Sequence, residues 1–273
     1  MRKSTVSRIP IGWLCGALQY HFKIMKSTGG RATFEEADAA LEQTLDELED
    51  NFPRYNEWLR SMVAGVAVGR VLEVGAGVGT FTVPLLKTAS EVIAVEPSRR
   101  GASELAVLAA TDPRIVVVHG LAADAEAHGP FDAAVLLNVL EHIEHDEAVL
   151  AELRQLVRPG GHVAVFSPAF ELLMSDFDRS IGHVRRYRRA DLSARFQRAG
   201  FEVTQAKYVN MAGFFAWFLV VRCINRRPTG LRLGSFYDRF VVRPTCWIEQ
   251  RIRPPFGQSV LVIGRVPLEL ALD

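Results

Sequence analysis

Cysteine is scarce in this 273-residue sequence, which contains only Cys15, Cys223 and Cys246. An odd number of cysteines without a Cys-x-x-Cys pair argues against both a disulfide framework and a zinc knuckle. A chain of this length can bury roughly three quarters of its unfolded surface, so it needs no covalent cross-links to fold. We therefore expect a reduced, cytoplasmic protein.

Long apolar runs are also missing, because no stretch reaches the roughly 18–20 apolar residues that a membrane-spanning helix needs. The closest stretches are residues 9–20 and 211–221, and the second is ended by Arg222. Within residues 211–227, aromatic side chains come first and arginines follow. This order fits a helix that lies on an anionic membrane surface, here the inner membrane face, and it fits a buried lid helix almost as well.

Acidic residues are few in one part of the chain. Residues 1–178 have 15 Lys and Arg against 25 Asp and Glu, whereas residues 179–257 have 16 basic residues and four acids. The second segment therefore carries a balance of +12. Such a segment suggests an anionic partner, such as phospholipid, a phosphorylated substrate or nucleic acid, and a solvated arginine-rich face is an equally good interpretation.

From residue 70 onward, short β-branched runs alternate with helical patterns. Alternation at this spacing predicts βαβ units, a parallel sheet and helices on both faces. The predicted fold class is therefore α/β, with a doubly wound, seven-stranded, mostly parallel sheet. The predicted strands are residues 71–74, 92–95, 115–118, 133–137, 162–166, 201–208 and 259–263.

Four regions follow from this pattern. Residues 1–60 are predicted to form a helical N-terminal extension, in which Pro53 opens a helix. Residues 61–208 form the core, and residues 259–273 supply its last strand and a tail. Residues 209–258, rich in Arg, Pro and aromatic side chains, are too long for a simple connection and predict an inserted basic and aromatic lid.

The sharpest motif is a glycine loop that follows the first predicted strand, Glu73-Val-Gly75-Ala76-Gly77-Val-Gly79. Glycines permit a tight turn and let a ligand approach the backbone, and a helix N-terminus after them presents free N–H groups. The spacing is G-x-G-x-G, which disfavours a dinucleotide, because that fingerprint requires G-x-G-x-x-G or A. A P-loop sequence is absent.

Glu96 ends the second predicted strand, 21 residues after Gly75. A carboxylate at this point can accept hydrogen bonds from both hydroxyls of a ribose. Together with the glycine loop, Glu96 predicts a nucleoside-containing cofactor.

These features resemble those of the class I S-adenosylmethionine-dependent methyltransferases, in particular the small-molecule type. Further matching segments are residues 131–138 and 156–161. The resemblance implies a Rossmann-like fold, S-adenosylmethionine as cofactor and an antiparallel last strand. The residues that it implies in cofactor binding are Glu73, Gly75, Ala76, Gly77, Gly79, Glu96 and Asn138.

Two histidines are candidates for the general base. Ligands of open α/β sheets bind beyond the carboxyl ends of the strands, and a hydroxyl nucleophile needs a base there. His142 follows the fourth strand, in a segment that resembles quinone-biosynthesis O-methyltransferases, and His183 follows the fifth. In those enzymes nearby acids can hold a metal, but Asn138 stands where an acid is common, and we expect no metal.

The segment Gly-His183-Val-Arg185-Arg186-Tyr187 resembles a subgroup of methyltransferases with a Gly-His-x-Arg-Arg-Tyr element. A histidine flanked by two arginines and a tyrosine could bind and deprotonate an anionic or polyhydroxylated acceptor. Arg185, Arg186 and Tyr187 are therefore candidate substrate-binding residues, although either arginine could instead pair with Asp176 or Asp178.

The leading hypothesis is an S-adenosylmethionine-dependent methyltransferase (transferase) that methylates oxygen of a small-molecule, sugar-like (glycan) or lipid-linked acceptor by in-line transfer with a histidine base. A nucleic-acid methyltransferase is an alternative, since the basic segment could follow phosphates. It is disfavoured because no Asn/Asp-Pro-Pro-Tyr/Phe element follows the fourth strand. A non-catalytic protein that keeps the fold is a further alternative.

Overall fold

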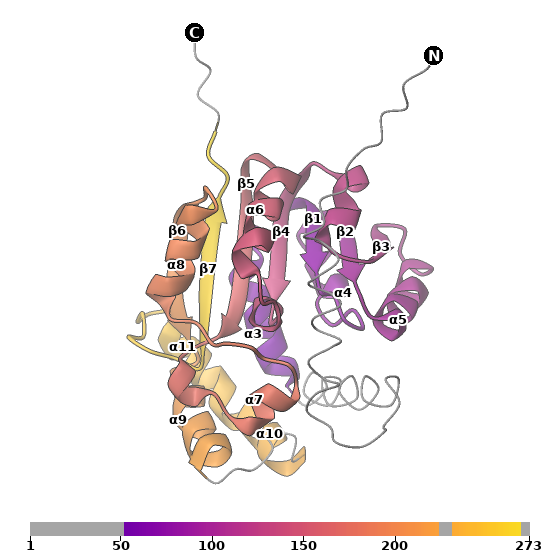
Figure 1. The fold of residues 1–273 in the computed structure, drawn as a ribbon. Coiled ribbons are helices and arrows are strands. Elements are labelled where there is room, and N and C mark those ends of the chain that lie inside the picture. Colours follow the sequence, from indigo (N-terminus) through magenta and orange to yellow (C-terminus); the bar gives the residue numbers. More distant parts are fainter. Residues whose placement is uncertain (1–51, 224–230, 269–273) are drawn as a thin grey trace, which may run out of the picture.

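The computed structural model describes residues 52–223 and 231–268. The predictions made above for residues 1–51, 224–227 and 269–273 lie outside these ranges. A single seven-stranded sheet with the order β3-β2-β1-β4-β5-β7-β6 forms its centre (Figure 1). All strand pairs among β1 to β5 are parallel, and β7 runs antiparallel to both β5 and β6. The predicted α/β fold class and the antiparallel last strand are confirmed.

The strands follow the predicted β-branched runs, which suit a sheet that is covered on both faces. Most of them extend a few residues beyond the predicted bounds, because strand ends pair without needing apolar side chains. The strands are β1 (Gly69–Val74), β2 (Ala89–Glu96), β3 (Ile115–His119), β4 (Phe131–Leu137), β5 (Val157–Pro168), β6 (Glu202–Val209) and β7 (Ser259–Arg265).

The helices of the core lie between these strands. The helix after the glycine loop is only the single turn of α4, because the glycine turn precedes it and β2 begins at Ala89. Gly200 has a φ of +86° and follows the end of α8, as a glycine at a helix C-terminus often does. The elements are α3 (Pro53–Val63), α4 (Thr82–Leu85), α5 (Arg99–Ala109), η1 (Ala122–His128), η2 (Leu140–His142), α6 (Asp146–Leu156), η3 (Glu171–Leu173), α7 (Asp176–Ser180) and α8 (Arg189–Arg198).

Two apolar layers enclose the sheet. On one face, alternate strand residues such as Leu72 pack with α6 and α8, and on the other face residues such as Val71 pack with Trp58 and Leu59 of α3. The two layers bury most side chains of β1 and β4 and those of residues 163–167 in β5. The sheet is therefore a rigid platform, and polar side chains with functional roles are left to the loops at its edges.

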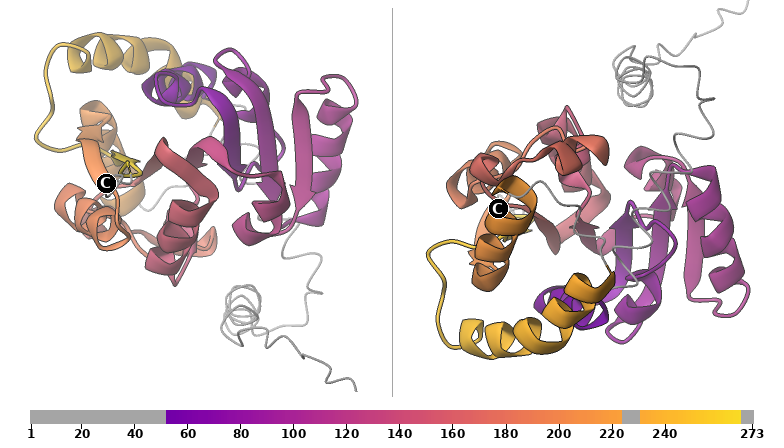
Figure 2. Two further views of the ribbon diagram at one scale, coloured as in Figure 1. Left: turned by 90° about the horizontal axis from the view of Figure 1, so that it is seen from above. Right: turned by 90° about the horizontal axis from the view of Figure 1, so that it is seen from below.

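Residues between β6 and β7 form helices that lie beyond the carboxyl ends of the parallel strands and beside α3 (Figures 1 and 2). They are α9 (Met211–Trp217), η4 (Phe218–Cys223), α10 (Leu231–Tyr237), η5 (Asp238–Val242) and α11 (Arg243–Glu249). Within the described ranges, no helix combines the length and apolar character needed to cross a membrane.

Two buried or half-buried acids attach this insertion to its neighbours. Asp238 accepts hydrogen bonds from the backbone N–H groups of Arg54 and Tyr55, at 3.2 and 2.9 Å, and so satisfies the N-terminus of α3. Glu249 accepts from the N–H groups of Asn210 and Met211, at 3.0 and 2.7 Å, at the start of α9. One helical segment thus holds the N-termini of two others.

Candidate active site

The order of the strands reverses between β1 and β4, and the loops that follow these two strands meet there. A Cβ built on Gly75 would lie only 2.6 Å from Cγ2 of Val139, so the loop after β1 passes directly beneath the loop after β4. In open α/β sheets a crevice forms at such a reversal, outside the carboxyl ends of the strands. The predicted cofactor loop therefore lies at the switch point of the sheet.

The glycine loop adopts a backbone that favours glycine. Gly75, Gly77 and Gly79 have φ values of +69°, +57° and +96°. The N–H groups of Gly75 and Ala76 donate to the carbonyl of Val95, at 2.9 and 3.1 Å, which ties the loop to the end of β2. A Cβ on Gly77 would meet none of the described atoms within 4 Å. The loop thus combines an anchored start with a backbone that a ligand can approach closely.

Glu96 lies at the end of β2 with its carboxylate against the glycine loop. Its Oε2 accepts from the N–H of Gly77 and its Oε1 from the N–H of Ser98, both at 2.8 Å. A carboxylate offers about four acceptor positions, so these two bonds fix its orientation without exhausting its capacity. The residues present fit the adenosine part of S-adenosylmethionine: Glu96 can receive ribose hydroxyls while the loop faces the amino-acid part.

Glu73 and Asn138, the other predicted cofactor residues, lie on either side of this point. Glu73 is buried, and its Oε2 accepts from the hydroxyl of Thr82 at 2.6 Å, which joins β1 to α4. Asn138 directly follows β4, is exposed and has a φ of +58°. Glu73 thus supports the loop from within, and the contact of Asn138 with the cofactor stays a prediction.

Beyond the ends of β4 and β5, the two predicted histidine segments come together. The N–H of Val184 donates to the carbonyl of Glu141 at 2.9 Å, which draws the loop after β5 onto η2. The rings of His142 and His183 meet edge to face with centroids 4.7 Å apart. Sequence analysis placed both histidines near the acceptor, and the structure brings them into contact with each other.

His183 is held by a buried carboxylate. Its Nδ1 lies 3.0 Å from Oδ1 of Asp178, and its Nε2 lies 3.9 Å from Oε1 of Glu141. Burial alone would raise the pKa of Asp178, but the hydrogen bond to His183, together with Arg186 and Ser175, lowers it to about 2. Asp178 is therefore a carboxylate, and Nδ1 of His183 carries the proton that it accepts.

Glu141 was not identified from the sequence as a site residue. It is fully buried, and its Oε2 accepts from the hydroxyl of Ser167 at 2.8 Å. Its Oε1 has no hydrogen-bond partner among the described residues and faces His183. Burial raises the pKa of Glu141, an effect opposed by His183. A buried oxygen of this kind calls for a polar partner, and the nearest polar group recorded beside it is Nε2 of His183.

His142 has a different environment. Burial, with the nearby His183 as a second cause, lowers its pKa to about 3. The imidazole of His142 is therefore neutral and a weak base at physiological pH. Of the two predicted bases, His183 has the geometry of an oriented imidazole.

Arg185, Arg186 and Tyr187 each have a partner within the chain. Arg186 is buried and contacts Asp178 through Nη2 at 2.6 Å, one of the pairings that the sequence left open. Arg185 contacts Asp146 at 2.7 Å, and the hydroxyl of Tyr187 donates to the same carboxylate at 2.7 Å. Their predicted contact with substrate stays a prediction, and the observed bonds give them a role in holding the loop after β5.

A metal could be held by one group of side chains in the described ranges. Glu141, His142 and His183 each offer a ligand atom, and these atoms lie within 4.8 Å of one another. The expectation of a metal-free site stays a prediction.

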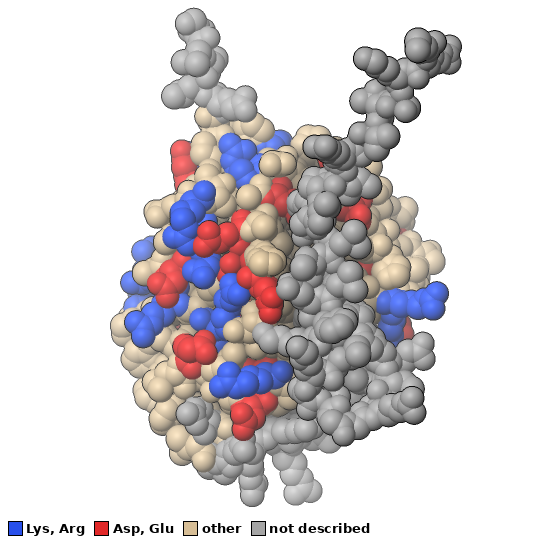
Figure 3. Space-filling model, in the orientation of Figure 1, with Lys and Arg blue, Asp and Glu red and all other residues tan. Residues whose placement is uncertain are grey.

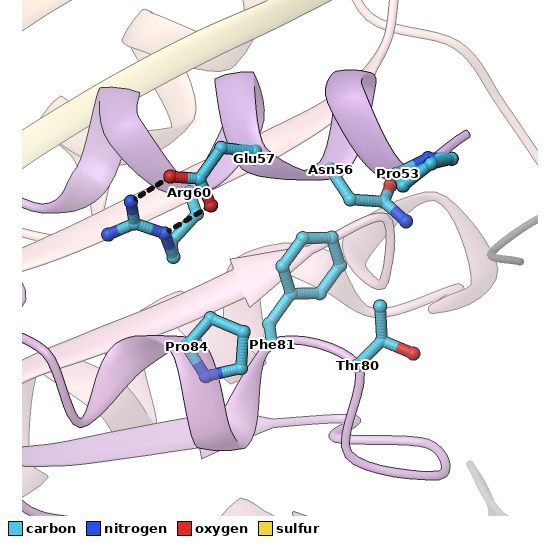
Figure 4. A pocket seen from close by; sticks show the side chains of 7 residues that line it. All are labelled: Pro53, Asn56, Glu57, Arg60, Thr80, Phe81 and Pro84. Carbon is cyan, nitrogen blue, oxygen red and sulfur yellow. Dashed lines mark hydrogen bonds and ion pairs between the residues drawn. The ribbon is translucent and has the colours of Figure 1, made fainter. Parts of the chain in front are cut away.

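A separate pocket of about 280 Å³ lies between α3 and the start of α4, next to the glycine loop (Figure 4). The ring of Phe81 points from the loop toward α3, where Glu57 and Arg60 bond to each other. The residues that line the pocket are Pro53, Asn56, Glu57, Arg60, Thr80, Phe81 and Pro84.

Part of the basic excess of residues 179–257 is neutralised by acids from the first part of the chain. Basic and acidic side chains intermingle on the face that α6 and α8 form (Figure 3). Arg195 contacts Asp146 at 2.9 Å, and Arg198 contacts Glu147 at 2.6 Å. This face therefore lacks the unbroken positive surface that tracking of nucleic-acid phosphates requires.

A family model described as a methyltransferase domain matches residues 37–206. The chain belongs to this family and is a class I S-adenosylmethionine-dependent methyltransferase with S-adenosylmethionine as its cofactor. The cofactor prediction is thereby confirmed.

Curated relatives match over a shorter stretch. An uncharacterized methyltransferase of Staphylococcus carnosus is 33% identical over 41% of this chain and 52% of its own length. A ubiquinone biosynthesis O-methyltransferase of Rhizobium johnstonii is 31% identical over 35% of this chain and 40% of its own length. The chain thus spans about half the length of the curated relatives that it matches.

Solved structures share the fold. A putative methyltransferase of Haloferax volcanii, in complex with the Trm112 methyltransferase activator, aligns with a TM-score of 0.58 at 14% identity, over 86% of this chain and 98% of its own. An S-adenosylmethionine-dependent methyltransferase of Clostridium acetobutylicum aligns with a TM-score of 0.52 at 8% identity, over 79% and 92%. At these identities the likeness establishes the fold alone.

Proposed function

We propose that this methyltransferase methylates a hydroxyl oxygen of a small, sugar-like or lipid-linked acceptor, with His183 as the general base. The observation that carries the proposal is the position of His183 between Asp178 and Glu141, beyond the ends of β4 and β5. The O-methyltransferases among the partly matching relatives support oxygen as the atom that is methylated.

Bound S-adenosylmethionine supplies an electrophilic methyl group on a sulfonium sulfur. A hydroxyl oxygen that takes up this methyl must lose its proton, and an oriented imidazole is suited to accept it. Because Asp178 holds Nδ1–H, Nε2 of His183 has the free electron pair. The proton of the acceptor hydroxyl therefore goes to Nε2.

The carboxylate of Asp178 explains why the resulting charge is tolerated in a nearly buried place, and Glu141 offers a second oxygen nearby. Once Nε2 is protonated, the imidazolium lies between the carboxylate of Asp178 and Oε1 of Glu141, at 3.0 and 3.9 Å from its two nitrogens. An opposite charge on a preorganised neighbour stabilises the ion as it forms. The side chain of His183 is only 8% exposed, so an acceptor at Nε2 is largely shielded from water.

Arg186 acts on His183 indirectly, through Asp178. It contacts Asp178 through two nitrogens, at 3.1 and 2.6 Å, and so fixes the carboxylate that orients His183. Asp178 and Arg186 are positioning residues in this proposal, and His183 alone takes the proton.

The test is transfer of labelled methyl from S-adenosylmethionine to cell-envelope glycan and lipid extracts, followed by identification of the product bond by mass spectrometry. We expect a methyl ether in the product and its loss with His183→Gln. Label on nitrogen, or on RNA added in parallel, would overturn the proposal for oxygen.

A further inference from the structure

The helical segment formed by α10, η5 and α11 exposes aromatic rings and arginines together, and we propose that this face docks on the surface of an anionic phospholipid membrane. We call it the arginine–aromatic face. It consists of Phe236, Arg239, Phe240, Arg243, Trp247 and Arg251.

The spacing of these residues puts them on one side of the segment. Positions 236, 240, 243, 247 and 251 follow each other at intervals of four or three residues, which is the repeat of a helical face. Phe236, Phe240 and Trp247 are 56%, 56% and 59% exposed. The rings of Phe236 and Phe240 lie 4.9 Å apart, and Trp247 follows them on the same side of the segment. Large exposed rings gathered in this way mark an interaction site.

The opposite side of the segment packs on the protein through apolar and polar side chains. Tyr237, Val242 and Cys246 join the apolar cluster that contains Trp58 and Leu59 of α3, while Asp238 and Glu249 bind backbone groups. A surface helix normally turns its apolar side to the core and its polar side to water. The inner side of this segment follows that rule, whereas its outer side adds the exposed rings of Phe236, Phe240 and Trp247 to its arginines.

The charges of the outer side have a single sign. From residue 234 to residue 253 the only acids are Asp238 and Glu249, and both point inward to the N-termini of α3 and α9. Arg239, Arg243 and Arg251 are exposed. A second copy of this chain on the same face would bring arginine against arginine about a two-fold axis. An anionic lipid surface is the occupant that complements this charge.

The side chains already have the arrangement that an interface between lipid and water requires. The guanidinium of Arg251 lies 4.0 Å from the ring centre of Trp247, and that of Arg239 lies 5.6 Å from the ring of Phe240. Rings and aliphatic stems can enter the headgroup boundary while the guanidinium groups remain at the phosphates. Sequence analysis expected such contact through residues 211–227, whereas this proposal places it on the next helical segment.

Binding to vesicles tests the proposal with the full chain. Sedimentation with vesicles of phosphatidylcholine and phosphatidylglycerol at low salt is compared with vesicles of phosphatidylcholine alone. We expect retention on the anionic vesicles only, and a roughly 100-fold weaker partition for the triple variant R239Q/R243Q/R251Q. The triple variant F236S/F240S/W247S is expected to lose retention as well.

A variant of equal charge change controls for net charge. Lys87, Arg158 and Arg198 are exposed on other elements, and K87Q/R158Q/R198Q is expected to sediment like the wild type. Binding of S-adenosylhomocysteine, measured by calorimetry, should be the same in all variants, which separates this proposal from the proposed function. A blue shift of tryptophan fluorescence on vesicle addition is expected in the wild type and absent in W247F.

Several results would overturn the proposal. They are a lack of retention on anionic vesicles, equal retention of wild type and R239Q/R243Q/R251Q, or a dimer in solution that F236S/F240S/W247S converts to monomer without any vesicle binding by the wild type.

Discussion

Nδ1 of His183 lies 3.0 Å from Oδ1 of Asp178, and the two residues are separated by one turn of helix and Gly182, whose φ is +85°. This contact gives the imidazole a defined proton position before any ligand arrives. It resembles in form the carboxylate–imidazole pairs that orient general bases in other enzymes.

Loss of the base should affect turnover and leave cofactor binding intact. For His183→Gln we expect kcat to fall by roughly 10²-fold or more, since general-base contributions are of that order. His142→Gln should lower kcat by less than about 10-fold, because an imidazole with a pKa of about 3 is a poor base. The measurement is methyl transfer to the acceptor found in the extract screen.

The matched control for this pair is His128→Gln, because His128 lies just before the amino end of β4, whereas His142 follows its carboxyl end. It should keep full turnover. Full turnover in both His183→Gln and His142→Gln would show that neither histidine is the base.

Asp178→Asn should reduce both stability and turnover. The substitution leaves the buried guanidinium of Arg186 without its partner, and breaking a buried pair in this way costs about 3 kcal/mol in the free energy of unfolding. Urea denaturation at neutral pH measures this loss. The same variant should lower kcat more than it changes KM, because an asparagine does not fix the proton on Nδ1.

Asp178→Glu distinguishes positioning from folding. If it restores kcat while the stability remains reduced, the carboxylate acts on His183. If stability and kcat recover only together, Asp178 serves the fold alone.

Protonation of His142 should make the protein less stable in mild acid. Between the ordinary pKa of 6.5 and the folded value of about 3, the unfolded chain binds a proton at this histidine and the folded chain does not. The free energy of unfolding therefore falls as the pH is lowered below 6.5, by up to about 1.4 kcal/mol for each pH unit. Urea denaturation at pH 7, 6 and 5 should show a smaller decrease for His142→Gln than for the wild type, and parallel curves would contradict the assignment.

Removal of the carboxylate at the end of β2 should weaken cofactor binding. For Glu96→Ala we expect affinity for S-adenosylhomocysteine in calorimetry to fall by roughly 100-fold or more, because two hydrogen bonds to a charged acceptor are lost. Glu96→Gln can still accept one bond from the loop and should lose less. Unchanged affinity in Glu96→Ala would refute the ribose assignment.

The sequence determined the order of the elements and the location of the cofactor loop. Both depend on local patterns: β-branched runs predict strands, and Gly75, Gly77 and Gly79 are required where the chain turns with positive φ. The acid Glu96 could be identified because its distance along the chain from the loop is set by one helix and one strand. All of these signals are carried by neighbours in sequence.

Only the tertiary structure determined which polar groups meet beyond β4 and β5. Glu141 follows β4, Ser167 lies at the end of β5, and Asp178 and His183 lie in the segment after β5; no spacing in the chain shows that these three segments converge. The tertiary structure also determined which side of the insertion packs on the protein. Asp238 and Glu249 bind backbone N–H groups of α3 and α9, so they fix the inner side of the insertion. The rings of Phe236, Phe240 and Trp247 therefore face outward. Contacts between distant segments depend on packing, and packing is decided by the whole fold at once.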